Sequence, residues 1–313
     1  MSFPLFTLFP IILFSIFFYK CLLSSSSTKK PLHLPPTPPK LPIIGNLHQL
    51  GKLPHRSLHS LSHKYGDFML LYFGNRPTLV VSSATAAEDI MKTREHFFLN
   101  RPKLRLIERL FYGGKDVGFS SYGENWRYRK SICVMQLLST KRVRSFRSIR
   151  EEEVNRMIEE IKSYGGMSAV NLSEISSALF KGLICRTALG RKYQDGYDDE
   201  SGKNVYKMFK ELSSVMGEIS VGDYVPFLGW VDRLSGLESR VESVRKQFDD
   251  FIEEIVQQHE IHLINRKEGY IVDDEEGLNV NDFVQVLLEI QRENPEQLSR
   301  ESIKGVILVS HAF

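Results

Sequence analysis

Two residues four positions apart, Trp126 and Lys130, have the side-chain types and the spacing to hold an anion together. Residues at i and i+4 share one face of an α-helix, so an indole N–H and an ammonium there can both donate to one carboxylate. The same spacing also suits simple packing of a lysine stem on an aromatic ring. Taken alone, the pair does not decide between these readings.

The interval that begins at this pair is strongly basic. Residues 127–150 contain no acidic residue and carry Arg127, Arg129, Lys130, Lys141, Arg142, Arg144, Arg147 and Arg150. Such a run is either a solvated face or a docking surface for an acidic protein. The net charge of +3 over 313 residues gives no general attraction to nucleic acid, so we expect no nucleic-acid partner.

The cysteines show no metal-binding or disulfide pattern. Cys21, Cys133 and Cys185 are far apart and fit neither a zinc spacing nor a disulfide framework. Cys133 and Cys185 fall within apolar helical patterns, which predicts buried core thiols. We therefore predict no metal ligand and assign no catalytic residue.

The elements that position these residues are mostly helices. Apolar periodicity predicts helices at 53–65, 84–93, 124–138, 141–164, 172–189, 204–216, 237–263 and 280–293. Two β-branched and aromatic runs at 68–73 and 78–82, joined at Gly74-Asn75, predict a β-hairpin. The fold class expected is mainly α with a small β-sheet.

The amino terminus has the character of a membrane anchor. Residues 3–23 are almost wholly apolar and would span about 30 Å as a helix. No basic residue precedes this run, Lys20 lies near its end, and Lys29, Lys30 and Lys40 follow it. This distribution predicts a single-pass anchor with the body in the cytosol; a cleaved signal peptide is the alternative. Residues 31–42 are proline-rich and predict a stiff spacer. We expect an anchor at 1–24, a hinge at 25–52 and the body at 53–313.

The order of several motifs resembles the microsomal cytochrome P-450 family, and within it the A-type group of plants. The motifs are Pro-Pro-Thr-Pro-Pro-Lys-Leu-Pro-Ile-Ile-Gly-Asn-Leu from residue 35, Phe-Leu-Asn-Arg-Pro from 98 and Tyr-Gly-Glu-Asn-Trp-Arg-Tyr-Arg-Lys from 122. Further blocks follow at 137–143, 184–193, 223–230 and 282–288. The resemblance runs from residue 1 to about residue 308.

This resemblance implies a haem cofactor, whose propionates would be held by Arg101, Trp126 and Lys130. Lys130 stands where the family usually has arginine, so the charge is kept and the bidentate fork is lost. It also implies the P-450 fold, anchoring in the endoplasmic reticulum membrane, and monooxygenation of a small apolar substrate. The electrons would come from NADPH through a reductase that docks on the basic interval.

Parts on which the family's chemistry depends are not among the 313 residues. Neither the Phe-x-x-Gly-x-Arg-x-Cys-x-Gly loop of the iron-ligand cysteine, nor the Glu-x-x-Arg helix, nor the Ala-Gly-Thr-Asp-Thr-Thr segment occurs. We therefore expect an incomplete P-450 fold that is inactive as given. The alternatives are a non-catalytic, truncated, membrane-bound product and an unrelated membrane-tethered binding module.

Overall fold

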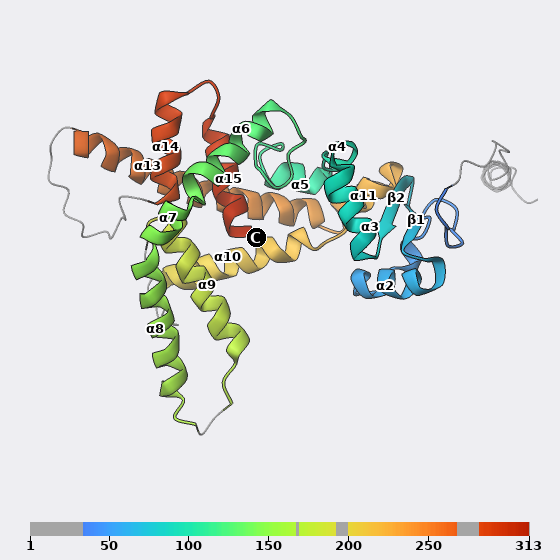
Figure 1. Ribbon diagram of the computed structural model, residues 1–313, viewed down its shortest axis with the longest axis horizontal. Coiled ribbons are helices and arrows are strands. Elements are labelled where there is room, and N and C mark those ends of the chain that lie inside the picture. The colour runs from blue at the N-terminus through green and yellow to red at the C-terminus, as the bar shows by residue number, and fades with distance from the viewer. Residues whose placement is uncertain (1–33, 167–168, 192–199, 268–281, 313) are drawn as a thin grey trace, which may run out of the picture. The chain divides into compact units, whose positions relative to one another are not determined.

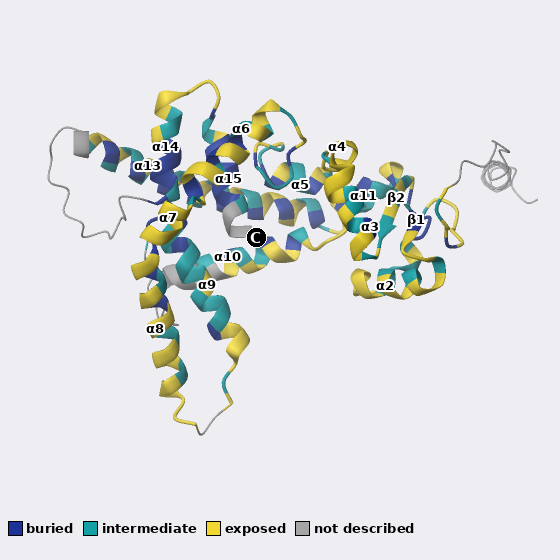
Figure 2. Ribbon diagram, viewed as in Figure 1, coloured by how far each residue is buried: buried dark blue, intermediate teal, exposed yellow. Residues whose placement is uncertain are grey.

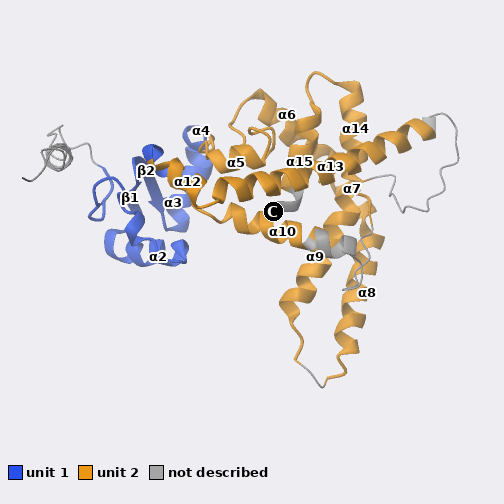
Figure 3. Ribbon diagram, turned by 180° about the vertical axis from the view of Figure 1, so that it is seen from behind, with its two compact units in different colours: residues 1–98, 224–227 blue, residues 99–223, 228–313 orange. Residues whose placement is uncertain are grey.

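The computed structural model describes residues 34–166, 169–191, 200–267 and 282–312. It is mainly helical with one two-stranded sheet, which confirms the predicted fold class (Figure 1). The predicted anchor at 1–24 and the first part of the hinge lie outside the described residues. Within the described ranges, no helix is both long and apolar enough to span a bilayer. The chain divides into two compact units, residues 1–98 with 224–227 and residues 99–223 with 228–313 (Figure 3).

The first unit is built around the predicted hairpin. Strands β1 (Phe68–Phe73) and β2 (Arg76–Val81) pair antiparallel, with Phe68 opposite Val81 and Phe73 opposite Arg76. Alternation along β1 buries Met69 and Leu71 completely. Around the hairpin lie η2 (Leu47–Gln49), α2 (Pro54–Tyr65), α3 (Ala84–Glu88), the π-turn η3 (Asp89–Thr93) and α4 (Glu95–Phe98).

The turn between the strands requires glycine. Gly74 has φ +59°, and a Cβ built on it would lie 2.1 Å from the carbonyl oxygen of Tyr224. A positive φ and a backbone contact that close leave no room for a side chain. This explains why the Gly74-Asn75 pair predicts the turn correctly.

The second unit is formed by helices that surround α13. Its elements are α5 (Arg105–Leu110), α6 (Glu124–Ile132), the π-turn η4 (Cys133–Leu137), α7 (Thr140–Ser145), α8 (Arg147–Ser163), α9 (Leu172–Ala188), α10 (Glu200–Met216), α11 (Val221–Tyr224), η5 (Pro226–Leu228), α12 (Trp230–Leu234), α13 (Leu237–Lys267), α14 (Phe283–Glu293) and α15 (Arg300–Ala312). Helices α11 and η5 run across the boundary between the units.

Helix α13 supplies the longest buried stripe of this unit (Figure 2). Phe248, Ile252, Ile255 and Val256 are almost fully buried, as their helical spacing predicts. The helix packs against α5, α10, α12, α14 and α15. Each helix that packs on α13 must have one apolar face, and the apolar periodicity of the sequence provides such faces.

Ion pairs join the polar edge of α13 to α15. Arg300 donates to Glu253 and Glu260 at 2.7 Å each, and Lys304 donates to Asp249 at 2.7 Å. The hydrogen bond from Arg300 holds the pKa of Glu253 at about 2. Ser299 caps the amino terminus of α15, because its hydroxyl accepts from the backbone N–H of Ser302.

Three predicted helices are interrupted in the structure. The single helix expected at 141–164 breaks into α7 and α8 at Phe146, whose side chain is buried and lies 6.1 Å from the Phe283 ring. A break there lets an aromatic side chain enter the core. The helices expected at 84–93 and 124–138 both pass into π-turns, where Arg94 bonds to Asp89 and Leu138 bonds to Cys133.

Candidate functional site

The candidate site lies in the second unit, between the segment 102–126 and helix α6. The loop before α6 turns at Gly113 and Gly114, which have φ values of +69° and +79°. The indole N–H of Trp126 donates to the carbonyl of Val117 at 2.9 Å. The loop is thereby attached to the first turn of α6.

Arg129 holds the same loop from the interior. Its side chain is buried, and it donates to the carbonyls of Asp116 at 3.2 Å and Gly114 at 3.4 Å. Burial lowers the pKa of Arg129, and the nearby Asp116 carboxylate opposes that effect. A buried cation with carbonyl acceptors fixes where the loop lies relative to α6.

Asp116 is the second buried charged residue of the site. Its Oδ1 accepts from the Phe119 N–H at 2.6 Å, and the Ser120 hydroxyl donates to its backbone carbonyl at 2.6 Å. Burial raises the pKa of the Asp116 carboxyl. Neither Asp116 nor Arg129 is singled out as a site residue by the sequence reasoning.

One signal in the sequence could have revealed Arg129. It precedes Ile132 by three positions, so both residues share the buried face of α6. A basic residue on the apolar face of a helix is a candidate for a buried, partnered cation.

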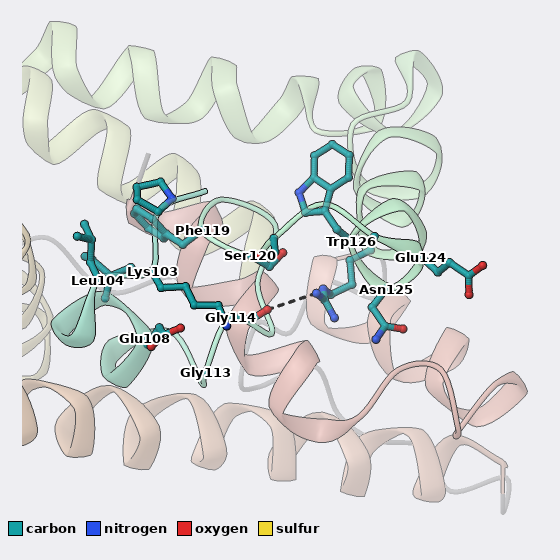
Figure 4. Close-up of a pocket in the computed structure, with 15 residues that line it drawn as sticks. Lys103, Leu104, Glu108, Gly113, Gly114, Phe119, Ser120, Glu124, Asn125 and Trp126 are labelled. Carbon is teal, nitrogen blue, oxygen red and sulfur yellow. Dashed lines mark hydrogen bonds between the residues drawn. The ribbon is translucent and has the colours of Figure 1, made fainter. Parts of the chain in front are cut away.

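The loop and α6 line a cavity of about 460 Å³ that is open to solvent (Figure 4). Its walls come from residues 102–104, 107–108, 113–114, 119–121 and 123–126 and from Arg129. Lys103, Glu108, Ser120 and Asn125 give these walls a mixed, polar character. The cavity adjoins the predicted anion-binding pair because Trp126 is part of its wall.

The structure brings Trp126 and Lys130 together but leaves Arg101 apart. The Lys130 ammonium lies 4.6 Å from the centre of the Trp126 ring, and Lys130 is exposed. Arg101 is also exposed; its neighbour Pro102 lines the cavity, whereas Arg101 does not. The Lys130 ammonium packs on the Trp126 ring and still reaches solvent. The pair can therefore make its packing contact and bind an anion at the same time.

The basic interval is solvated except at Arg129. Arg127, Lys141, Arg144 and Arg147 are exposed. Arg129 is buried, so its assignment to a docking surface is wrong. The reason is the helical register, which turns Arg129 inward while Arg127 points outward.

The Cytochrome P450 family model matches residues 35–310. The chain belongs to the cytochrome P450 family. It is 46% identical over 298 residues to Cytochrome P450 736A117 of Prunus mume, covering 95% of this chain and 56% of the relative. It is 44% identical over 309 residues to Norfluorocurarine oxidase of Strychnos, covering 97% of this chain and 59% of the relative. The chain thus spans little more than half the length of these cytochrome P450 relatives.

Solved cytochrome P450 structures share the fold. A zebra fish cytochrome P450 with progesterone aligns with a TM-score of 0.62 and 20% identity, covering 83% of this chain and 56% of that chain. A second structure of the zebra fish protein, with abiraterone, gives a TM-score of 0.64 at 19% identity. Complete members of the cytochrome P450 family carry haem as their cofactor.

Among the described residues of this P450 chain, side chains on α6 suit the haem propionates, whereas no cysteine suits the haem iron. An exposed ammonium beside an indole on α6 suits a propionate carboxylate. The iron of the family requires a cysteine thiolate. Cys185 is buried in the core, and burial raises the pKa of the half-buried Cys133 thiol to about 11, so neither described cysteine suits that role. This confirms the predicted burial of Cys185; Cys133 is only partly covered.

Proposed function

We propose that this chain is the propionate-binding part of a haem-thiolate monooxygenase of specialised metabolism. The observation that carries the proposal is the Trp126–Lys130 pair on α6, beside the cavity and within the matched family region. When bound, the haem supplies the activation of oxygen, and one oxygen atom enters a small apolar substrate. Lys130 would pair with one propionate, and Trp126 would exchange its bond to Val117 for a second donor contact.

Arg101 completes the proposed propionate grip. It is exposed and directly precedes a residue of the cavity wall, so its long side chain can approach an anion bound at that edge. Three donors of this kind would orient the haem through its carboxylates. The other residues that line the cavity are a mixture of apolar, polar and charged side chains, which does not identify a class of substrate.

A titration of the purified chain with haem tests the grip. We expect Lys130→Gln to weaken haem binding by up to about tenfold, because one charge-assisted hydrogen bond is lost. The matched control is Arg127→Gln, which removes an exposed charge from the same helix and should leave binding unchanged. Soret absorbance reports the binding directly.

The dimethyl ester of haem makes this test specific. Its esterified propionates carry no charge. The wild-type chain and Lys130→Gln should therefore bind the diester with equal affinity. If Lys130→Gln weakens the binding of haem and of its dimethyl ester equally, Lys130 acts through folding and the proposed contact with a propionate is wrong.

The environments of the cysteines favour a second candidate, a non-catalytic membrane-bound polypeptide. Cys185 is buried, and burial raises the pKa of the partly covered Cys133 thiol to about 11, so neither described cysteine suits a thiolate ligand. A reduced carbon monoxide difference spectrum of the haem-loaded chain tests whether this chain supplies a thiolate to the iron. We expect no thiolate-type Soret band; its appearance would show that this chain ligates the iron itself.

The proposed setting is the endoplasmic reticulum membrane with the body in the cytosol. Its basis is the apolar run at 3–23, which no basic residue precedes and which Lys29 and Lys30 follow, together with the proline-rich hinge. The proposed organisation is an anchor at 1–24, a hinge at 25–52 and a haem-domain portion at 53–313. An NADPH-dependent reductase would dock on the exposed basic residues Arg127, Lys141 and Arg144.

A further inference from the structure

Helix α2 in the first unit carries three histidines that the proposed function does not use. His55, His59 and His63 follow one another at four-residue intervals, so they lie along one side of the helix. All three are exposed. Among the described residues, no segment covers these three side chains.

Two of these histidines already face each other. The Nε2 atoms of His59 and His63 are 3.2 Å apart, and their ring centres are 4.6 Å apart at an interplanar angle of 75°. In this contact one Nε2–H donates to the lone pair of the other Nε2. The two nitrogens thus converge on a single position and share one proton there.

The separation of the two nitrogens matches that of a chelated metal ion. Two imidazole nitrogens bound to one tetrahedral Zn²⁺ at about 2.0–2.1 Å are about 3.3 Å from each other. The observed 3.2 Å is close to this value, so a rotation of the rings that turns both Nε2 lone pairs toward one position would place them for a shared ion. Two histidines at i and i+4 on a helix are also the spacing that zinc-binding helices use.

We propose that His59 and His63 form a surface site for a late first-row divalent metal ion, such as Cu²⁺, Ni²⁺ or Zn²⁺. The ion takes the place of the shared proton and is held by both Nε2 atoms, with water in its other positions. The described residues contain no cluster of three or more histidine, cysteine, aspartate or glutamate side chains arranged for a metal, so the site is bidentate. Imidazole nitrogens favour these metals over Mg²⁺ and Ca²⁺, and Cu²⁺ should bind most tightly.

Helix α2 is suited to hold such a site. It begins with Pro54 at its first turn and ends at Gly66, so its length is fixed at both ends by the local sequence. It packs against β1. The metal would join two successive turns of a helix that is already formed.

Copper titration of the full chain, purified without a histidine tag, tests the proposal. We expect His59→Gln to weaken Cu²⁺ binding about tenfold or more, because it leaves His55 and His63 eight positions apart and so converts a chelate into a single ligand. The control His96→Gln removes another exposed histidine of the same unit and should leave the affinity unchanged. Binding is measured by calorimetry against a competing chelator, with MgCl₂ as the metal that should not bind.

A variant with the same number of histidines excludes a general effect of composition. His63→Gln combined with Lys64→His moves one imidazole by about 100° around the helix, away from His59. It should bind Cu²⁺ as weakly as His63→Gln alone. Wild-type affinity in this double variant, or an equal loss in His96→Gln, would overturn the proposed site; far-UV circular dichroism confirms that α2 stays folded in each variant.

Discussion

A single buried histidine makes the stability of the second unit depend on pH. His259 Nδ1 lies 2.8 Å from the carbonyl of Ile255, and its Nε2 lies 2.9 Å from the carboxylate of Asp282. Both partners are acceptors here, so both ring nitrogens donate and the imidazole is protonated. Burial alone lowers the pKa of His259, but Asp282 and the Ile255 carbonyl outweigh burial and Arg191, and the pKa is raised above 6.5.

The sign of the pH effect follows from that raised pKa. Above pH 6.5 the unfolded chain loses this proton while the native chain keeps it, so the free energy of unfolding falls as pH rises. The slope contributed by His259 approaches about 1.4 kcal/mol per pH unit until its native pKa is reached. We expect urea unfolding at several pH values to show this slope and His259→Gln to remove it.

The matched change for His259 is His262→Gln, three residues further along α13. This variant should keep the slope of the wild-type chain. An unchanged slope in His259→Gln would mean that His259 does not carry the proton.

One buried side chain, Asn46, helps to place the proline-rich hinge. Its Nδ2 donates to the carbonyls of Pro38 and Pro39, and its Oδ1 accepts from the N–H of Tyr72 on β1. Prolines have no N–H, so their backbone can be held only through their carbonyls; the carbonyl of Pro36 likewise accepts from the N–H of Leu70 on β1. Asn46 thus ties the hinge to the sheet.

We expect Asn46→Ala to release the hinge. The substitution leaves the partly buried Tyr72 N–H without its acceptor and costs about 1–3 kcal/mol. Limited proteolysis should then cleave residues 34–45 faster, by roughly tenfold or more at that cost.

The control for the hinge is Gln49→Ala. Gln49 also donates to Pro39, at 2.8 Å, but that contact is exposed and water can replace it. Equal cleavage rates in the two variants would show that burial of Asn46 does not secure the hinge.

At the scale of the whole molecule, the basic interval is the feature that acts over distance. The chain as a whole carries only +3, so attraction of an acidic reductase must come from the exposed residues around α6 and α7. We expect Arg127→Glu with Arg144→Glu to slow association with the reductase about tenfold at low ionic strength. Stopped-flow measurements should show the difference shrink as salt is added.

The control for docking makes the same change in net charge elsewhere. Lys52→Glu with Lys64→Glu reverses two exposed lysines outside the interval and should leave the association rate nearly unchanged. If both double variants slow association equally, net charge and not the basic interval attracts the reductase.

Much of the fold was predictable because it is encoded locally. The hairpin, the start of α9 near Asn171 and the stripe on α13 follow from turn residues, capping residues and apolar period, which all act over a few positions. The short helices α5 and α12 are not predicted, because five or six residues show too little period. The break at Phe146 is not predicted either, since it depends on a core contact with a residue more than a hundred positions away.

The amino-acid sequence alone identified the family, because its motifs keep their order along residues 35–310. It also identified the Trp126–Lys130 pair and the basic run, because each depends on residue type and spacing within one segment. Only the tertiary structure decided which charged residues are buried. Arg129 and His259 lie among basic or acidic neighbours in the sequence, and their burial depends on carbonyls and carboxylates that other segments bring to them. The cost of burying a charge is set by those distant partners, and no local pattern contains them.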